Sequence, residues 1–182
     1  WLAKFQQFDL QFLDSHPDTI APTTAITDCS AQNVENKEAE KLFGQMKQQG
    51  VAPNLVTYNT IISTFATKGN GHGAVSWFHK IEEAKLQPDA HSYTSIIHAF
   101  SHYGDATNAA IWLSKMQNAS IQPCSKSMNA VIDAYVKRLD WRGALNWYHN
   151  IPKVAKFHPD IITFKSLFIA LRDASCSWKD IA

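Results

Sequence analysis

One sequence pattern returns along most of this chain. The stretch APNLVTYNTIISTF (residues 52–65) is followed by QPDAHSYTSIIHAF (87–100) and HPDIITFKSLFIAL (158–171), each with a proline, a small polar residue and a partly apolar run. Between them, WFHKI, WLSKM and WYHNI begin in steps of 35 residues, at Trp77, Trp112 and Trp147. A fixed period of this length indicates a repeat architecture, in which each unit buries its apolar face only against its neighbours.

The prolines and tryptophans divide the chain into units of about one period each. We predict one continuous solenoid domain, because no unit of this size can bury a core alone. Its segments are 1–19 (the end of a preceding repeat plus a loop), 20–54 (a repeat with a degenerate first helix), the repeats 55–89, 90–124 and 125–160, and the partial repeat 161–182.

Each unit is predicted to form a pair of short helices. Apolar residues lie at helical spacing in the first half of a unit, as from Tyr58 to Phe65. Gly69 and Gly104 follow these stretches, where a helix would end in a left-handed cap. The second half carries a small residue that allows close helix packing, followed by several bulky apolar residues. The proline at the end of the unit ends this second helix. The small residues are Ala39, Ala74, Ala109 and Ala144. The predicted fold is therefore all-α.

Composition narrows the possible functions. The chain has 17 basic and 16 acidic residues, so its net charge of +1 gives no general attraction to nucleic acid or to anionic membranes. No apolar run is long enough to cross a membrane, and we expect no membrane insertion. Cys29, Cys124 and Cys176 are far apart and odd in number, which favours a reduced compartment over a disulfide framework or a zinc site. No targeting peptide is visible before Trp1.

The segments NLVTYNTIISTF…GVAPN and AHSYTSIIHAF…LQPD resemble the pentatricopeptide repeat family, in its plain 35-residue form. The likeness covers nearly the whole chain and is strongest over residues 40–135. It implies an α-solenoid wound as a right-handed superhelix. It also implies single-stranded RNA as the partner, in mitochondria or chloroplasts, with roles in RNA processing, stability or translation. In this family one repeat reads one base through two or three side chains.

The resemblance implies particular RNA-binding residues. The fifth residue of a unit faces the base edge and the last residue tunes the hydrogen-bond pattern, while the second packs on base faces. By this analogy Thr24/Asn54 favours adenine, Asn59/Asp89 and Asn129/Asp160 favour uracil, and Thr94/Cys124 favours a purine, so the expected sequence is 5′-A-U-purine-U-3′. Val56 is the base-packing residue of its unit and Lys137 occupies a phosphate-contacting position.

Several positions depart from the family pattern. His91 and Lys126 replace the usual apolar base-packing residue. The phosphate-contacting lysine is replaced at Gln32, Thr67, His102 and Asp173, so the electrostatic part of RNA affinity should be weak. Lys165 stands at the fifth position of the last unit and predicts no base.

These departures leave a second function open, that of an architectural or protein-binding repeat subunit of an organellar ribosome or another large assembly. It would use exposed apolar or loop surfaces such as Trp141 and Trp178. In that case Asn59 and Asn129 would be ordinary polar residues of a helix surface.

Catalytic and metal-binding motifs have little support in the sequence. His98 and His102 have the spacing of zinc ligands, but neither a Glu between them nor a third ligand completes a site. The signature H-x-E…P-C-x-x-C of zinc deaminases is missing. We therefore predict no enzyme, no metal and no cofactor.

Overall fold

Helices follow one another along all of the chain that the computed structural model describes, which is residues 36–155 together with residues 161, 165 and 168. They are α3 (Asn36–Gln48), α4 (Leu55–Thr67), α5 (Gly71–Glu83), α6 (Ala90–His102), α7 (Ala106–Asn118), α8 (Ser125–Lys137) and α9 (Trp141–Ala155). Within these residues no strand is present, which confirms the all-α prediction.

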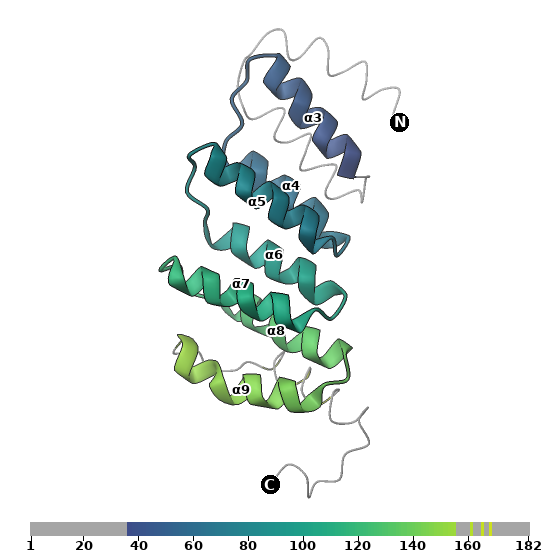
Figure 1. Ribbon diagram of the computed structural model, residues 1–182, viewed down its shortest axis with the longest axis vertical. Coiled ribbons are helices and arrows are strands. Elements are labelled where there is room, and N and C mark those ends of the chain that lie inside the picture. Colours follow the sequence, from purple (N-terminus) through teal and green to yellow (C-terminus); the bar gives the residue numbers. More distant parts are fainter. Residues whose placement is uncertain (1–35, 156–160, 162–164, 166–167, 169–182) are drawn as a thin grey trace, which may run out of the picture.

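Helical hairpins stack along the long axis of the molecule. The pairs α4–α5, α6–α7 and α8–α9 each form a hairpin, and Figure 1 shows them following one another from the N-terminal to the C-terminal end. The first helices pack on one another, α4 on α6 and α6 on α8, while the second helices form the layer in front. This arrangement is an α-solenoid, so the predicted architecture is confirmed.

Polar caps begin two of the described first helices, α4 and α6. Asn54 caps α4 and Asp89 caps α6, each through a capping box with the residue three positions later, Thr57 and Ser92. A capping box satisfies two backbone donors that the first turn of a helix leaves without partners. The helices α4, α6 and α8 begin at Leu55, Ala90 and Ser125, in steps of 35 residues.

The first helix of each described hairpin ends in a left-handed turn. Gly69 and Gly104 have φ angles of 70° and 75°, which confirms the predicted cap positions. The N–H of Gly69 donates to the carbonyl of Ala66, and the N–H of Asn70 donates to that of Phe65, each at 2.9 Å. The equivalent residue after α8 is Leu139, whose φ of 58° places a side chain in a conformation that glycine adopts at lower cost.

Aromatic residues form the joints between successive hairpins. The Phe43 ring lies 5.2 Å from the Tyr58 ring and 4.8 Å from the Trp77 ring, in edge-to-face contacts. The same triad recurs one period later, where Phe78 lies 4.9 Å from Tyr93 and 5.0 Å from Trp112. Such contacts stabilise a core beyond the area they bury. Trp77 and Trp112 are only 3% and 4% exposed, so both rings belong to the buried core between hairpins.

Some of the predicted units extend beyond the residues that the structure describes. Segment 1–19, the first helix of unit 20–54, and most of segment 161–182 lie outside the described residues. The division into units therefore remains a prediction. Among the described helices, none combines the length and the apolar character that a membrane span requires.

Candidate nucleic-acid interface

Asn59 and Asp89 meet at the junction between the first two complete hairpins. Asn59 is the fifth residue of α4, and Asp89 is the cap of α6. The Asn59 amide donates from Nδ2 to Asp89 Oδ1 at 3.0 Å and accepts at Oδ1 from the Ser92 hydroxyl at 2.6 Å. Two helices that are adjacent in the stack thus share one polar cluster.

The environment of Asn59 fixes the orientation of its side chain. Asn59 is only 6% exposed, so its amide needs hydrogen-bond partners inside the protein. With one bond at each end, the amide keeps one N–H and one oxygen lone pair for a further partner. A group that offers both a donor and an acceptor can distinguish the hydrogen-bonding edges of bases.

The same cluster stabilises the charge on Asp89. Partial burial by itself would raise the pKa of this carboxyl. Hydrogen bonds from the backbone and hydroxyl of Ser92 and from Asn59, together with the nearby His91, outweigh burial and hold the pKa below its ordinary value. Asp89 is therefore an anionic acceptor at neutral pH.

Thr94 and Cys124 occupy the equivalent positions one hairpin later. Cys124 begins α8 but makes no side-chain cap hydrogen bond, unlike Asn54 and Asp89. Although partial burial raises the pKa of its thiol, the nearby polar groups of Ser127, of the Lys126 backbone and of the Thr94 side chain together lower it. The structure thus brings Thr94 and Cys124 together, with a sulfur where Asp89 offers a carboxylate.

The other two pairs are only partly described. Asn54 caps α4 and accepts from the Thr57 backbone at 3.0 Å, while its expected partner Thr24 lies outside the described residues. Asn129 is 6% exposed on α8, and its expected partner Asp160 is also outside them. The structure therefore brings together the residues of two of the four predicted pairs, and their role in RNA binding stays a prediction. Asn59 and Asn129 are both largely buried, which argues against the interpretation that they are ordinary polar residues of a helix surface.

Val56 and Lys137 differ in how available they are to a ligand. Val56 has an exposed fraction of 58%, and thus presents an apolar side chain to solvent one turn before Asn59. Lys137 donates from Nζ to the carbonyls of Ser101 at 3.0 Å and His102 at 3.2 Å. A cation at the end of α6 stabilises carbonyls that lack helical partners. Lys137 therefore joins α8 to α6 whether or not it contacts a phosphate.

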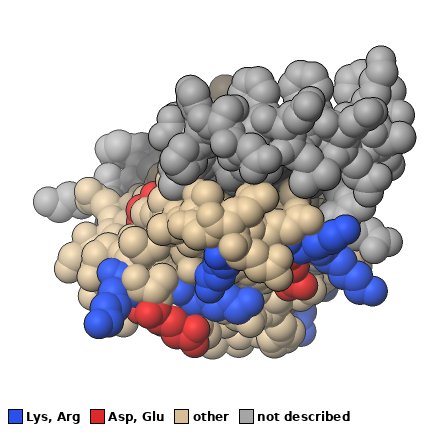
Figure 2. Space-filling view, turned by 90° about the horizontal axis from the view of Figure 1, so that it is seen from above, with Lys and Arg blue, Asp and Glu red and all other residues tan. Residues whose placement is uncertain are grey.

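The first helices carry few charges. Neither α4 nor α6 contains Lys, Arg, Asp or Glu, and α8 contains Lys126, Asp133 and Lys137. Figure 2 shows the Lys and Arg side chains in separate groups, with acidic side chains beside some of them, across the face in view. No group of three or more His, Cys, Asp and Glu within the described residues is placed to hold a metal ion.

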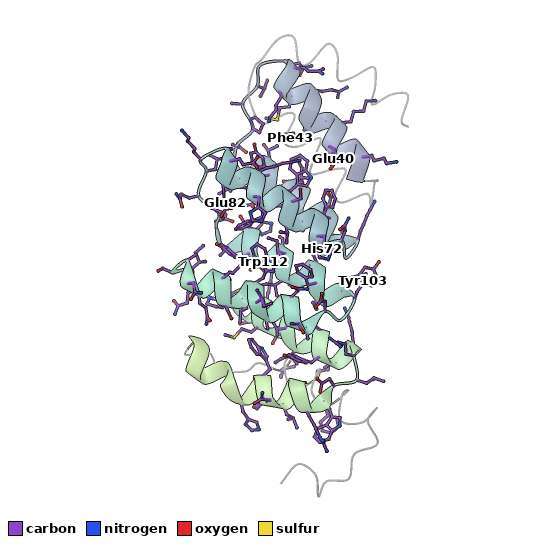
Figure 3. All side chains as sticks on the ribbon, viewed as in Figure 1. Glu40, Phe43, His72, Glu82, Tyr103 and Trp112 are labelled. Atoms are coloured by element: carbon purple, nitrogen blue, oxygen red, sulfur yellow. The ribbon has the colours of Figure 1, made fainter. Side chains whose placement is uncertain are left out.

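The second helices form a different surface. Glu40 and Phe43 project from α3 toward α5, as Figure 3 shows, where Glu40 accepts from Trp77 Nε1 at 3.2 Å. These residues line an open hollow of about 590 Å³. The Nζ of Lys80 lies 3.5 Å from the centre of the Trp77 ring, so a cation covers that ring.

Sequence reasoning missed Ser92 as a member of the polar cluster. A signal existed, because the third residue of each described first helix is a Ser or Thr: Thr57, Ser92 and Ser127. That pattern predicts a capping box. It does not predict which hydroxyl also reaches the preceding hairpin, since this depends on how α4 and α6 are rotated against each other.

Family models match most of the chain. The PPR repeat family matches residues 53–102, the pentatricopeptide repeat domain matches residues 16–68, and the PPR repeat matches residues 91–121 and 126–153. No curated protein gives a significant match to this sequence.

Solved structures share the fold. The crystal structure of the pentatricopeptide repeat protein PPR10 from maize matches with a TM-score of 0.79 and 19% identity, covering 96% of this chain and 24% of that one. PPR10 in complex with an 18-nt psaJ RNA element matches with a TM-score of 0.75 and 25% identity, covering 96% and 27%. The chain thus spans about a quarter of the PPR10 chains.

A third similar structure is closer to this chain in length. The PPR domain of Arabidopsis thaliana protein-only RNase P 1 in complex with tRNA matches with a TM-score of 0.70 and 16% identity, covering 88% of this chain and 83% of that one. Sequence models and structural similarity agree on the repeat unit and on its stacking. This chain belongs to the pentatricopeptide repeat family.

Proposed function

We propose that the chain binds single-stranded RNA along the surface of α4, α6 and α8, with one base at each junction between hairpins. The similar structures named above include PPR10 with an RNA element and a PPR domain with tRNA, which supports RNA as the class of ligand. The RNA is an organellar transcript or ribosomal RNA. The chain contributes recognition and no catalytic step.

The observation that carries this proposal is the hydrogen bond between Asn59 and Asp89 at the α4–α6 junction. It holds an amide with one remaining donor and one remaining acceptor beside an anionic acceptor. Val56, one turn away and 58% exposed, adds an apolar contact for a base face. A polar reader beside an apolar platform is the combination that base recognition requires.

The proposed reading follows the four pairs in chain order. Thr24/Asn54 takes adenine, Asn59/Asp89 takes uracil, Thr94/Cys124 takes a purine and Asn129/Asp160 takes uracil. Lys137 adds a phosphate contact through the N–H that its two carbonyl bonds leave over. Because four bases define a common sequence, we place this chain within a longer array that acts in RNA processing, stability or translation in a mitochondrion or chloroplast.

Equilibrium binding to short RNAs tests this proposal. The probe carries AUGU within a cytosine-rich strand, and the comparison RNA has these four bases scrambled. We expect tighter binding to AUGU, and we expect Asn59→Ala to weaken it about tenfold, which corresponds to about 1.4 kcal/mol. Thr60→Ala, on the same helix, is the control and should have little effect. Equal affinity for both RNAs, unchanged by Asn59→Ala, would refute base reading.

One observation favours a second function, that of a protein-binding subunit in a large assembly. The absence of Lys and Arg from α4 and α6 removes much of the attraction to phosphates that RNA binding normally uses. Affinity purification with and without nuclease separates the two functions. Partners that remain after nuclease digestion support the protein-binding subunit, and loss of all partners supports RNA binding.

A further inference from the structure

Ser92 is the third polar side chain of the Asn59–Asp89 cluster. It lies in the first turn of α6 and is fully buried. Its backbone N–H donates to Asp89 Oδ1 at 2.9 Å, and its hydroxyl oxygen accepts from the Asp89 backbone N–H at 3.2 Å. The same oxygen lies 2.6 Å from Asn59 Oδ1. One residue therefore contacts both members of the proposed reading pair.

The hydrogen-bonding capacity of Ser92 gives the cluster a direction. A hydroxyl has a single hydrogen, and the 2.6 Å contact to Asn59 Oδ1 is shorter than the 3.0 Å contact to Asp89 Oδ1. With that hydrogen on Asn59 Oδ1, the amide nitrogen faces the carboxylate. The reversed amide would set its oxygen against Asp89, and two acceptors would then face each other.

We propose that Ser92 is a positioning residue for base reading, which acts together with Asp89 to fix the orientation of the Asn59 amide and thereby the choice of uracil over cytosine. Uracil presents N3–H and O4, whereas cytosine presents N3 and an amino group, so donor and acceptor are exchanged between them. An amide held one way distinguishes the two bases. An amide that can rotate matches either of them. This inference rests on the proposed function.

The next junction supplies a matched position. Ser127 is the equivalent of Ser92 and is also fully buried. Its hydroxyl donates to the Cys124 carbonyl at 2.8 Å, within its own helix turn. Ser127→Ala therefore removes a buried hydroxyl from the same place in a helix, and the hydrogen bond that is lost lies within the first turn of α8.

The test measures a ratio of affinities, because a purely structural role would lower stability and overall affinity without changing selectivity. The dissociation constants for AUGU and ACGU are measured for the wild type, Ser92→Ala, Ser92→Thr and Ser127→Ala. We expect Ser92→Ala to reduce the preference for uracil about tenfold. Ser92→Thr, which keeps the hydroxyl, and Ser127→Ala should both keep the wild-type preference. An unchanged ratio in Ser92→Ala would overturn the proposal.

A second pair of variants covers the case in which Ser92→Ala does not fold. Ser92→Thr and Ser92→Val have nearly the same shape and differ in the hydroxyl, so only the valine variant should lose selectivity. Equal selectivity in these two variants would overturn the role of Ser92.

An RNA-free measurement separates this proposal from the proposed function. The side-chain amide protons of Asn59 are followed by NMR, and they should exchange with solvent faster in Ser92→Ala than in the wild type or Ser127→Ala. If the amide is released but no variant, including the wild type, prefers AUGU, base reading fails while the local positioning stands. If exchange is unchanged, Ser92 does not position Asn59.

Discussion

Asp89 has two structural roles that are linked by a single oxygen. Its Oδ1 accepts from the Ser92 backbone, which caps α6, and from the Asn59 amide, which belongs to α4. Because both bonds favour the ionised form, they lower the pKa of this carboxyl against the opposing effect of burial. The residue that closes one unit thus stabilises the start of the next one.

Substitution of Asp89 by Asn predicts a pH dependence. The native-state pKa of Asp89 is depressed, so the stability that its charge contributes is fully present above the unfolded pKa of about 3.9. It is lost as the pH falls through the lower native-state value. The free energy of unfolding of the wild type should therefore exceed that of Asp89→Asn at pH 6, and the difference should shrink below pH 4. Denaturant unfolding at several pH values measures it, and a difference that does not vary with pH would contradict this account.

Lys137 offers a second test at the scale of one side chain. If its remaining N–H contacts a phosphate, Lys137→Met should reduce the slope of log Kd against log salt by about 1. If it only binds the carbonyls of Ser101 and His102, the variant should be slightly less stable and the slope should not change. Lys115→Met is the control, because Lys115 lies over the Trp112 ring on a second helix. A slope lowered equally by both variants would argue against a specific contact.

At the scale of helices, the cap position explains why α8 differs from α4 and α6. Asn54 and Asp89 accept backbone hydrogen bonds at the start of their helices, whereas Cys124 makes no side-chain cap bond. Asp and Asn are among the most favourable capping residues, and apolar residues are much poorer. The start of α8 is therefore less stabilised than the starts of the two preceding first helices.

Restoring a cap to α8 should stabilise the chain. We expect Cys124→Asp to raise the free energy of unfolding by about 1 kcal/mol, since the new carboxylate can accept from the Ser127 backbone as Asp89 does from Ser92. Cys124→Ala is the control and should give no gain. Both are measured by denaturant unfolding at pH 7. A gain in the alanine variant equal to that of the aspartate variant would show that removal of the thiol is responsible.

At the scale of the whole molecule, periodicity was sufficient to predict the stack. The step from Trp77 to Trp112 places identical rings in identical joints, and both are buried as expected. The positions of the glycines also predicted the turns correctly, since Gly69 and Gly104 adopt the left-handed conformation. These features depend on neighbours in sequence or on exact repetition, and a single sequence contains both.

The polar junctions were only partly predictable. The contact between Ser92 and Asn59 joins residues 33 positions apart and depends on the rotation of one helix against the next. The bonds of Lys137 to the end of α6 have the same cause. Sequence position indicates which residues can meet, but the packing of α4, α6 and α8 decides which atoms hydrogen-bond.

The most direct test of the central claim exchanges one reading pair for another. The double variant Asn59→Thr with Asp89→Asn converts the second junction from Asn/Asp to the Thr/Asn combination of the first, and asparagine preserves a favourable helix cap. Dissociation constants are measured for the wild type and this variant with AUGU and AAGU. We predict that the wild type prefers AUGU, that the variant prefers AAGU, and that each preference is about tenfold. A variant that keeps the preference of the wild type, or a wild type without any preference, would contradict the claim that this junction reads a base.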